Sequence, residues 1–189
     1  MIYYFGTFNP IHNGHIQIAE DVANTLKSEI IFVPAYDSPW KPELKDSFNH
    51  RINMIKLCGL NVSTIEKDLP TPSYTYQTIN SLYQNERIHM IIGYDQFFHI
   101  EEWKHFEILK EKCHFIVIPR TVPEQDKYKR LSKMKDKGWK FNNCVMDLIN
   151  ISSSRIREYI KYGKDISKFI PKQVEDYIKE NKLYFDSTP

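Results

Sequence analysis

Two histidines three residues apart, His12 and His15, are the side chains in this sequence best suited to chemistry on a phosphate. They lie in the segment GTFNPIHNGH, which runs from Gly6 to His15. A short apolar run typical of a β-strand precedes this segment, and apolar residues at helical spacing follow it. We expect Asn13 to cap the helix. The first turn of this helix then offers free backbone N–H groups and the positive end of the helix dipole beside both imidazoles. The sequence therefore predicts a site for an anionic ligand.

Gly6 and Gly14 flank this segment, and we expect them to leave room for a ligand to approach the backbone. The ordinary alternative is that each histidine only caps a helix or faces solvent. The spacing of the histidines, the two glycines and the position between strand and helix together favour the anion site. The pattern differs from the phosphate loop G-x-x-x-x-G-K-[ST], so it does not indicate a Walker-type ATPase.

The segment ISSSRIR, at residues 151–157, has the pattern of a helix that begins with serine caps. Hydroxyl groups and free N–H groups at a helix N-terminus bind triphosphate oxygens well, and the Arg157 guanidinium adds a forked donor that is always charged. The alternative is an ordinary capped helix with a surface arginine. Beside the two histidines, the segment favours a second phosphate contact.

Four weaker candidates leave alternatives open. Asp95, in the sequence GYDQ, is placed to accept hydrogen bonds from a ribose or simply to cap a helix. Trp103 and Trp40 each offer a flat face on which a base could stack, or they belong to the core. Lys41 lies in a long loop of the kind that often covers active sites, or it is a solvated surface lysine.

The chain alternates short apolar runs with amphipathic segments, which predicts an α/β fold with a Rossmann-like, doubly wound parallel sheet. The expected strands are 2–5, 30–33, 62–65, 89–92, 115–118 and 144–148. The expected helices are 14–26, 48–57, 74–83, 106–111, 125–137, 154–161 and 172–180. In such a sheet ligands bind beyond the carboxyl ends of the strands, and the unusual residues all follow expected strands at that edge.

Composition limits the classes of function. There are 26 basic and 24 acidic side chains, giving a formal net charge of +2, so the charge does not indicate binding along a nucleic acid. No apolar run approaches the roughly 20 residues of a membrane span, and no signal-peptide pattern follows Met1, so we expect a soluble, cytoplasmic protein. Three widely separated cysteines predict buried thiols rather than disulfides or a zinc site. The lysine-rich segment 124–140 predicts a solvated helix face, with attraction of a polyphosphate as the alternative.

The histidine segment matches the GxFxPxHxGH signature of the nucleotidyltransferase superfamily. Taken with the other motifs, the chain resembles the bacterial nicotinate-nucleotide adenylyltransferase family over most of its length. The matching stretches are GTFNPIHNGH at 6–15, the proline-rich loop ending in Lys41, His50 and Arg51 with Met54, SYT at 73–75, GYDQ at 93–96, Trp103 and ISSSRIR at 151–157.

This resemblance implies one nucleotidyltransferase domain over residues 1–189, with residues 154–189 as a small C-terminal helical extension. It implies that ATP and nicotinate mononucleotide react to give deamido-NAD and pyrophosphate, and that Mg²⁺ accompanies the ATP while the protein itself provides no metal site. It indicates no nucleic-acid or membrane partner and leaves the oligomeric state open, a homo-oligomer included.

The resemblance also assigns roles to residues. The implied catalytic residues are His12, His15 and Arg157. The implied ATP contacts are Gly6, Thr7, Phe8, His12, His15, Gly93, Asp95, Ile151, Ser152, Ser153 and Arg157. The implied contacts to the acceptor nucleotide are Lys41, Tyr74, Thr75, Trp103, Lys104 and Arg120.

Several residues depart from the family pattern. Phe5 stands where a second glycine is usual, and Asn9 stands where aspartate is common. On the acceptor side, Lys104 replaces an aromatic residue, and the run IPRT at 118–121 replaces Arg-Pro-Gly-Tyr. A lysine there favours the nicotinate carboxylate, although the altered pocket would also admit neutral nicotinamide. The alternatives are therefore an enzyme that uses nicotinamide mononucleotide and makes NAD directly, a phosphopantetheine adenylyltransferase or cytidylyltransferase, and a non-catalytic nucleotide-binding regulatory module.

Overall fold

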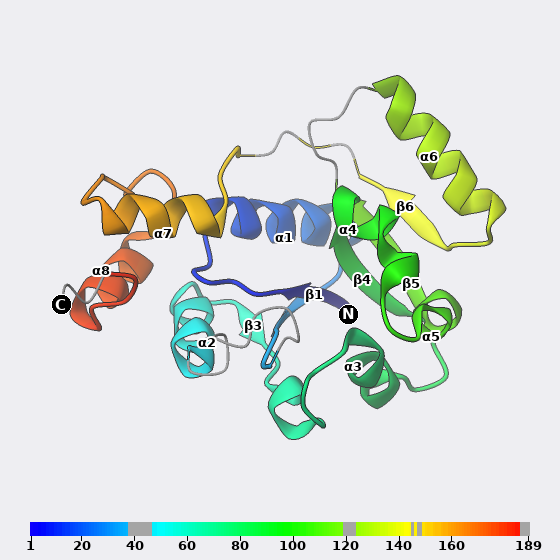
Figure 1. Ribbon diagram of the computed structural model, residues 1–189, viewed down its shortest axis with the longest axis horizontal. Helices are drawn as coiled ribbons and strands as arrows, with labels where there is room; N and C mark the ends of the chain where they lie inside the picture. Colours follow the sequence, from blue (N-terminus) through cyan, green and yellow to red (C-terminus); the bar gives the residue numbers. More distant parts are fainter. Residues whose placement is uncertain (38–46, 119–123, 145, 147–148, 186–189) are drawn as a thin grey trace.

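The fold is built on six parallel strands in the order β3-β2-β1-β4-β5-β6 (Figure 1). The computed structural model describes residues 1–37, 47–118, 124–144, 146 and 149–185. The strands are β1 Ile2–Gly6, β2 Ile30–Pro34, β3 Asn61–Val62, β4 Ile88–Gly93, β5 Cys113–Ile118 and β6 Phe141–Asn143. The first three strands extend from β1 at the centre to β3 at one edge of the sheet. The chain then returns to the centre, where β4 pairs with β1, and the last three strands extend to β6 at the other edge. This arrangement confirms the predicted doubly wound sheet, with its switch point between β1 and β4.

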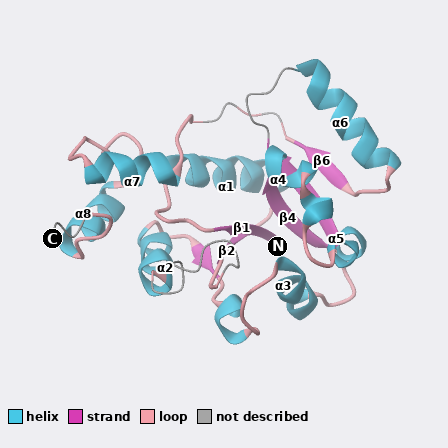
Figure 2. Ribbon diagram, viewed as in Figure 1, coloured by secondary structure: helices cyan, strands magenta, loops and turns pink. Residues whose placement is uncertain are grey.

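Helices cover the sheet on both sides (Figure 2). They are α1 Asn13–Leu26, α2 Phe48–Leu57, α3 Thr75–Leu82, α4 Tyr94–Phe98, α5 Phe106–Lys112, α6 Glu124–Asp136, α7 Ser153–Lys161 and α8 Lys172–Glu180. Two 3₁₀ turns, Ile65–Asp68 and Ile100–Glu102, lie between them. The expected helices at 48–57 and 172–180 are confirmed to the residue, and the others agree within one or two residues at each end.

Alternating residues of the central strands divide the core into two clusters. On β4, Ile91 packs into a cluster that contains side chains of α1, α2, α7 and α8. Its neighbours Met90 and Ile92 point to the other face, into a cluster with side chains of α3, α4, α5 and α6. A strand that is apolar on both faces is what a buried parallel sheet requires, and this explains why the expected strands were continuous apolar runs.

The sheet edges differ from the sequence expectation. The last strand among the described residues lies at Phe141–Asn143 and pairs with Phe115–Val117, before the expected 144–148, of which residues 145, 147 and 148 lie outside the described residues. The expectation followed the apolar residues, but this edge strand is only three residues long and includes two asparagines. The third strand is only Asn61–Val62, so the expected strand at 62–65 was right at residue 62 alone. Strands this short carry too little side-chain pattern to be placed from sequence.

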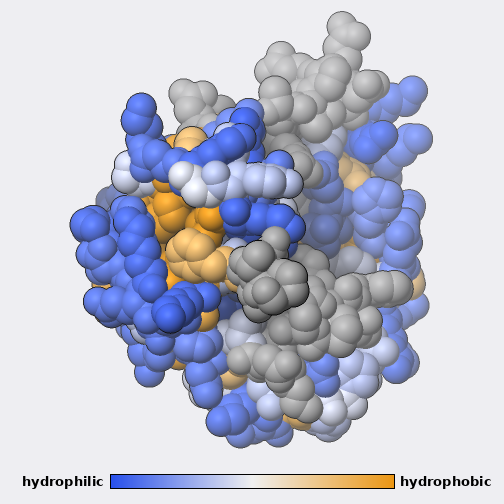
Figure 3. Space-filling model, turned by 60° about the vertical axis from the view of Figure 1, so that its left-hand side comes forward, coloured by the Kyte–Doolittle hydropathy of each residue, from blue (hydrophilic) through white to orange (hydrophobic). Residues whose placement is uncertain are grey.

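The C-terminal helices pack on the same core as α1. Ile156 and Ile160 of α7 and Val174 and Ile178 of α8 are buried in the α1 cluster. Figure 1 shows α7 and α1 along the same side of the sheet. The face over this end of the molecule is mostly hydrophilic, with an apolar band recessed between polar side chains (Figure 3). These helices therefore hold the segment 151–153 against the first βα turn.

The basic segment forms α6. Its residues Lys129, Lys133 and Lys135 are exposed, while Leu131 and Met134 turn into the core. This confirms the solvated face that we expected. Within the described part of the chain, no helix is long and apolar enough to cross a bilayer.

Candidate active site

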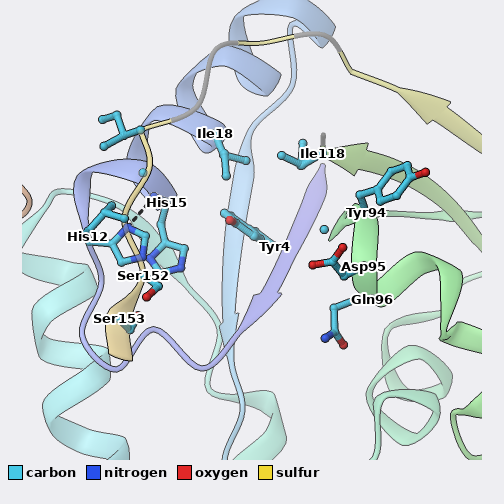
Figure 4. Close-up of a pocket in the computed structure, with 14 residues that line it drawn as sticks. Tyr4, His12, His15, Ile18, Tyr94, Asp95, Gln96, Ile118, Ser152 and Ser153 are labelled. Atoms are coloured by element: carbon cyan, nitrogen blue, oxygen red, sulfur yellow. Dashed lines mark hydrogen bonds between the residues drawn. The ribbon is translucent and has the colours of Figure 1, made fainter. Parts of the chain in front are cut away.

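A cavity of about 340 Å³ lies at the switch point between β1 and β4, where an open α/β sheet binds its ligands. This volume falls in the usual range of small-molecule sites. Figure 4 shows the two histidines and two serines on one side and Tyr94, Asp95 and Gln96 on the other. The lining residues among those described are Tyr4, His12, Gly14, His15, Ile18, Gly93, Tyr94, Asp95, Gln96, Ile118, Ile149, Ile151, Ser152 and Ser153. Segments 140 residues apart in the sequence thus meet at one cavity, as the motifs predicted.

The two imidazoles stack on each other, with ring centroids 3.6 Å apart and an angle of 19° between the ring planes. His12 is the N-cap of α1, because its Nδ1 accepts a hydrogen bond from the His15 backbone N–H at 3.3 Å. We expected Asn13 in that role, but its side chain instead donates to the Lys168 carbonyl. The cap leaves Nδ1 of His12 unprotonated, so the neutral ring carries its proton on Nε2.

Burial keeps both imidazoles neutral near pH 7. His12 is only 6% exposed, and burial lowers its pKa from 6.5 to about 4. Burial also lowers the pKa of His15 well below its usual value, and the adjacent His12 adds to this effect. The Nδ1 of His15 is buried without a partner among the described residues. An anion that bound beside these two uncharged rings would raise their pKa values, because a nearby negative charge favours the protonated form. It would also offer a partner to the unsatisfied nitrogen of His15.

We expect the free protein to lose stability as the pH falls from about 6.5 to about 4. In this window a histidine in the unfolded chain binds a proton while His12 in the folded protein does not, so acid favours the unfolded state. His12 alone accounts for about 2 to 3 kcal/mol at the lower end of the window. Urea unfolding at several pH values measures the slope. The variant His12→Asn keeps a good helix cap but has no titrating group, so its slope should be smaller. Equal slopes in the two proteins would contradict the assignment.

The loop that carries the histidines, residues 6–15, is held by side chains from distant elements; we refer to it as the histidine loop. Arg51 of α2 donates to the Thr7 carbonyl at 2.8 Å. Arg157 and Ser153 of α7 donate to the carbonyls of Asn9 and Pro10 at 2.8 and 2.9 Å. The loop backbone is therefore fixed at residues 7, 9 and 10 without a ligand. Such a preorganised loop does not need to rearrange as charge develops in a reaction.

The serine-rich segment begins a helix, as we predicted. Ser152 is the N-cap of α7 and its hydroxyl accepts a hydrogen bond from the Arg155 N–H at 3.3 Å. Ile151, Ser152 and Ser153 all line the cavity. The N-termini of α1 and α7 thus both open onto it, and each contributes the positive end of a helix dipole. Arg157 is not among the lining residues, because its guanidinium reaches Asn9 and the Ser154 hydroxyl instead.

Both glycines of the histidine loop lie close to side chains of the same loop. A Cβ at Gly6 would lie 2.7 Å from the Phe8 ring, and one at Gly14 would lie 3.1 Å from Nδ1 of His12. Phe8 is only 1% exposed and forms part of the core. The residues that line the cavity do not include Gly6, Thr7 or Phe8. The ATP contacts expected at these three residues stay predictions. Gly14 alone of the pair also faces the cavity.

The segment that follows β4 faces the histidines across the cavity. Gly93 is the N-cap of α4, so Asp95 lies in the first turn of that helix and the alternative of Asp95 as its N-cap is wrong. Both residues line the cavity. A Cβ at Gly93 would meet nothing within 4 Å among the described residues, so no contact with them requires glycine there. The open space beside it is available to a ligand.

Among the described residues, Tyr74, Thr75 and Lys104 of the expected acceptor contacts lie together at the start of α3. Lys104 is exposed and places its Nζ 4.3 Å from the centroid of the Tyr74 ring, a cation–π contact. Thr75 is the first residue of α3 and is half-buried. Trp103 is half-buried and packs against the core cluster of β4 and β5. The predicted residues Trp40, Lys41 and Arg120 lie outside the described residues.

Sequence reasoning missed several cavity residues. Tyr4, Ile18, Tyr94, Gln96 and Ile118 line the cavity and were assigned no role. Tyr4 and Ile118 lie toward the carboxyl ends of β1 and β5, which is where ligands are expected in this fold. That position was the one available signal for them. Apolar and aromatic walls are usual in nucleotide-sized pockets, but nothing in a single sequence separates such residues from ordinary core.

Comparison with known proteins agrees with this geometry. The family model Cytidylyltransferase-like matches residues 3–159. A protein of Staphylococcus epidermidis described as "Probable nicotinate-nucleotide adenylyltransferase" is 33% identical over 98% of this chain and 97% of its own. A relative of the same description from Clostridium tetani is 35% identical over 95% of this chain and 96% of its own. The Plasmodium falciparum nicotinic acid mononucleotide adenylyltransferase, in a structure complexed with NaAD, has the same fold, with a TM-score of 0.73 and 22% identity over 97% and 96% of the two chains.

The match to the family model covers most of the chain, and these two relatives align over nearly their whole length. The fold, the cavity at the switch point and the two motifs that meet there are consistent with this assignment. The chain belongs to the cytidylyltransferase-like family and, within it, to the nicotinate-nucleotide adenylyltransferases.

Proposed function

We propose that this protein transfers the adenylyl group of ATP to nicotinate mononucleotide, giving deamido-NAD and pyrophosphate. One observation supports this above all others: the histidine loop and the serine-capped start of α7 line one cavity. A triphosphate that lies between two helix N-termini would be held by backbone N–H groups, by the hydroxyls of Ser152 and Ser153, and by the two imidazoles.

The reaction needs no protein nucleophile. A phosphate oxygen of the mononucleotide attacks the α-phosphorus of ATP, the bond from that phosphorus to the bridging oxygen breaks, and pyrophosphate leaves with the electron pair. Catalysis then consists of alignment and of stabilising the charge that builds up on the phosphate oxygens. His12 and His15 would donate hydrogen bonds to these oxygens. Arg157 would hold the triphosphate with the N–H groups that do not bind the loop.

Mg²⁺ would accompany the ATP rather than occupy a site built by the protein. The described residues contain no group of three or more histidine, cysteine, aspartate or glutamate side chains that could hold a metal ion. Mg²⁺ is commonly bound by substrate phosphates together with water, and this mode fits a cavity lined mainly by imidazoles, hydroxyls and apolar groups. When bound, the ion would neutralise charge on the departing pyrophosphate.

Lys104 supports nicotinate as the acceptor. Its ammonium group lies over the Tyr74 ring, at the start of the helix whose first residue is Thr75. A positive charge at this position favours the carboxylate of nicotinate over the neutral amide of nicotinamide, since the amide offers no ion pair. We therefore propose that Lys104 contributes to the choice of acceptor.

Pyrophosphate release from ATP with each mononucleotide tests both proposals. We expect kcat/KM for nicotinate mononucleotide to exceed that for the nicotinamide form by about tenfold or more. Lys104→Gln should narrow this preference. Lys112→Gln is a matched control, because Lys112 lies 4.6 Å from the Tyr83 ring centroid in a similar contact at the other end of α3.

Each other outcome has a definite meaning. Preference for the amide in the unmodified protein would identify a nicotinamide mononucleotide adenylyltransferase. Turnover only with phosphopantetheine or with CTP would identify one of the other nucleotidyltransferases. Binding of ATP with no turnover of any acceptor would identify a regulatory module. An unchanged preference in Lys104→Gln would remove this lysine from its role and leave the activity itself in place.

A further inference from the structure

Arg51 of α2 is completely buried, with no exposed surface. Its Nη1 donates to the Thr7 carbonyl at 2.8 Å, its Nη2 donates to the Ala35 carbonyl at 2.7 Å, and its Nε donates to the Ser47 hydroxyl at 3.1 Å. Burial lowers the pKa of this guanidinium to about 10, so it stays charged near pH 7. A buried charge is costly unless it is fully hydrogen-bonded, so its partners indicate what the residue is for.

The two carbonyls belong to the loops that leave neighbouring strands. Thr7 immediately follows β1 and begins the histidine loop, and Ala35 immediately follows β2. The Ala35 N–H also donates to the Gly6 carbonyl at 2.9 Å. A planar guanidinium that bonds both loops fixes the separation between them, because its donors have a rigid fork geometry. The lysine ammonium is a single compact charge and does not have this geometry.

Glu66 continues the connection toward the acceptor side. It is only 5% exposed, and its Oε2 accepts from the Tyr36 N–H at 3.1 Å while its Oε1 accepts from the Thr78 hydroxyl of α3 at 3.1 Å. Burial raises the pKa of this carboxyl, and the positive charge of Arg51 acts in the opposite direction. Residues 35–37 are thus held on one side by the arginine and on the other by the glutamate.

The same strand end is bonded directly to the segment 73–75, which we refer to as the acceptor turn. The Ser73 N–H donates to the Asp37 carbonyl at 2.8 Å, and the Asp37 N–H donates to the Ser73 hydroxyl at 3.0 Å. Ser73 is itself buried. A continuous path of hydrogen bonds and backbone therefore leads from Thr7 in the histidine loop, through Arg51 and residues 35–37, to Ser73 of the acceptor turn. Glu66 adds a parallel link from Tyr36 to Thr78 of α3.

We propose that Arg51 and Glu66 are positioning residues that set the distance and orientation between the histidine loop and the acceptor turn, and so align the two substrates for in-line attack. This inference rests on the proposed function, which places ATP at the loop and the mononucleotide at the turn. Alignment contributes strongly to such reactions, and a misplacement of about 1 Å can cost about a hundredfold in rate. Each residue binds backbone and hydroxyl groups, so neither needs to touch a substrate.

A positioning role differs measurably from a merely structural one. If the two residues only stabilised the fold, the variants would lose melting temperature and folded fraction, and the folded molecules would turn over normally. If they shaped one binding site, the KM for that substrate would rise. Misalignment between two intact sites should instead lower kcat while each substrate still binds nearly as before.

The test uses Arg51→Lys, which keeps the buried charge but lacks the fork, in the full-length protein well below its melting temperature. With activity expressed per folded molecule, we expect kcat to fall by about thirtyfold or more, with both KM values within about threefold of the unmodified protein. Arg87→Lys is the matched control. Arg87 also donates to two backbone carbonyls, those of Lys110 and Cys113. It lies at the amino ends of β4 and β5, opposite the carboxyl ends of the strands that border the cavity. The kcat of the Arg87→Lys variant should equal that of the unmodified protein.

Glu66→Gln provides a second variant should Arg51→Lys fold poorly, because it keeps the size and one acceptor oxygen but removes the charge. We expect a fall of about tenfold in kcat, and less than additive losses when the two substitutions are combined. A kcat within about threefold of the unmodified protein in either folded variant, or a rise in one KM at constant kcat, would overturn the proposal. An unmodified protein that makes no pyrophosphate from ATP and either mononucleotide would instead defeat the proposed function.

Discussion

Replacing His15 with alanine should lower kcat by about a hundredfold or more while the protein remains folded. The His15 ring is held in place by the His12 ring, stacked at 3.6 Å, and by the edge of Phe8, with centroids 5.0 Å apart. In the proposed reaction a donor fixed in this way would point toward the α-phosphate, so its loss would remove an interaction that strengthens in the transition state. Steady-state pyrophosphate release measures kcat, and circular dichroism with thermal unfolding reports the fold.

His114→Ala is the control for this substitution. His114 lies on β5, away from the cavity, and its Nε2 pairs with the Asn142 amide oxygen at 2.8 Å. Its removal should leave kcat within about twofold, since no substrate contact is lost. A folded His15→Ala protein that kept more than about a tenth of the normal kcat would show that the imidazole does not act on the transition state.

Arg157→Ala should produce the second large loss, about a hundredfold in kcat/KM. We expect this size because the side chain would act in two ways. Its guanidinium donates to the Asn9 carbonyl of the histidine loop at 2.8 Å, and its remaining N–H groups would hold the triphosphate. Arg157→Lys should recover only part of the activity, because an ammonium does not bond the loop and the phosphate in the same forked geometry.

Arg155→Ala is the matched control on the same helix. Arg155 is exposed, and its guanidinium binds the hydroxyl of Tyr159 at 2.8 Å rather than the histidine loop. Pyrophosphate release should be unchanged in this variant. Equal activities for Arg157→Ala and Arg155→Ala would contradict the assigned role. Full recovery in Arg157→Lys would show that charge alone matters and that the fork does not.

The sequence was informative where a local pattern has one structural meaning. Helix α7 begins at the serine segment because a serine hydroxyl satisfies an N–H group that the first turn leaves free. The central strands were recognisable because a parallel sheet is apolar on both faces. The meeting of the histidine loop with residues 151–153 followed from the rule that ligands bind at the carboxyl edge of such a sheet.

Other features depend on residues that are distant in the chain. Gly6 is required by the Phe8 ring, and the N-cap of α1 is His12 because Asn13 is engaged by the Lys168 carbonyl. Helix α4 spans only five residues, too few to show a helical period. Arg51 was part of a recognised motif, but its carbonyl partners are visible only once the strands are assembled. The roles assigned to the site residues remain predictions.

The anchoring of the histidine loop also has a consequence for the order in which the protein matures. The Asn13 N–H donates to the Phe169 carbonyl at 2.8 Å, and the Tyr184 hydroxyl donates to the Asn9 side chain at 2.6 Å. Because translation runs from the N-terminus, the ribosome makes the two histidines more than 150 residues before it makes these anchors. The nascent chain thus carries the histidine loop long before these anchors exist, and we expect competence to bind nucleotide to arrive only after residues 169 and 184 have been made.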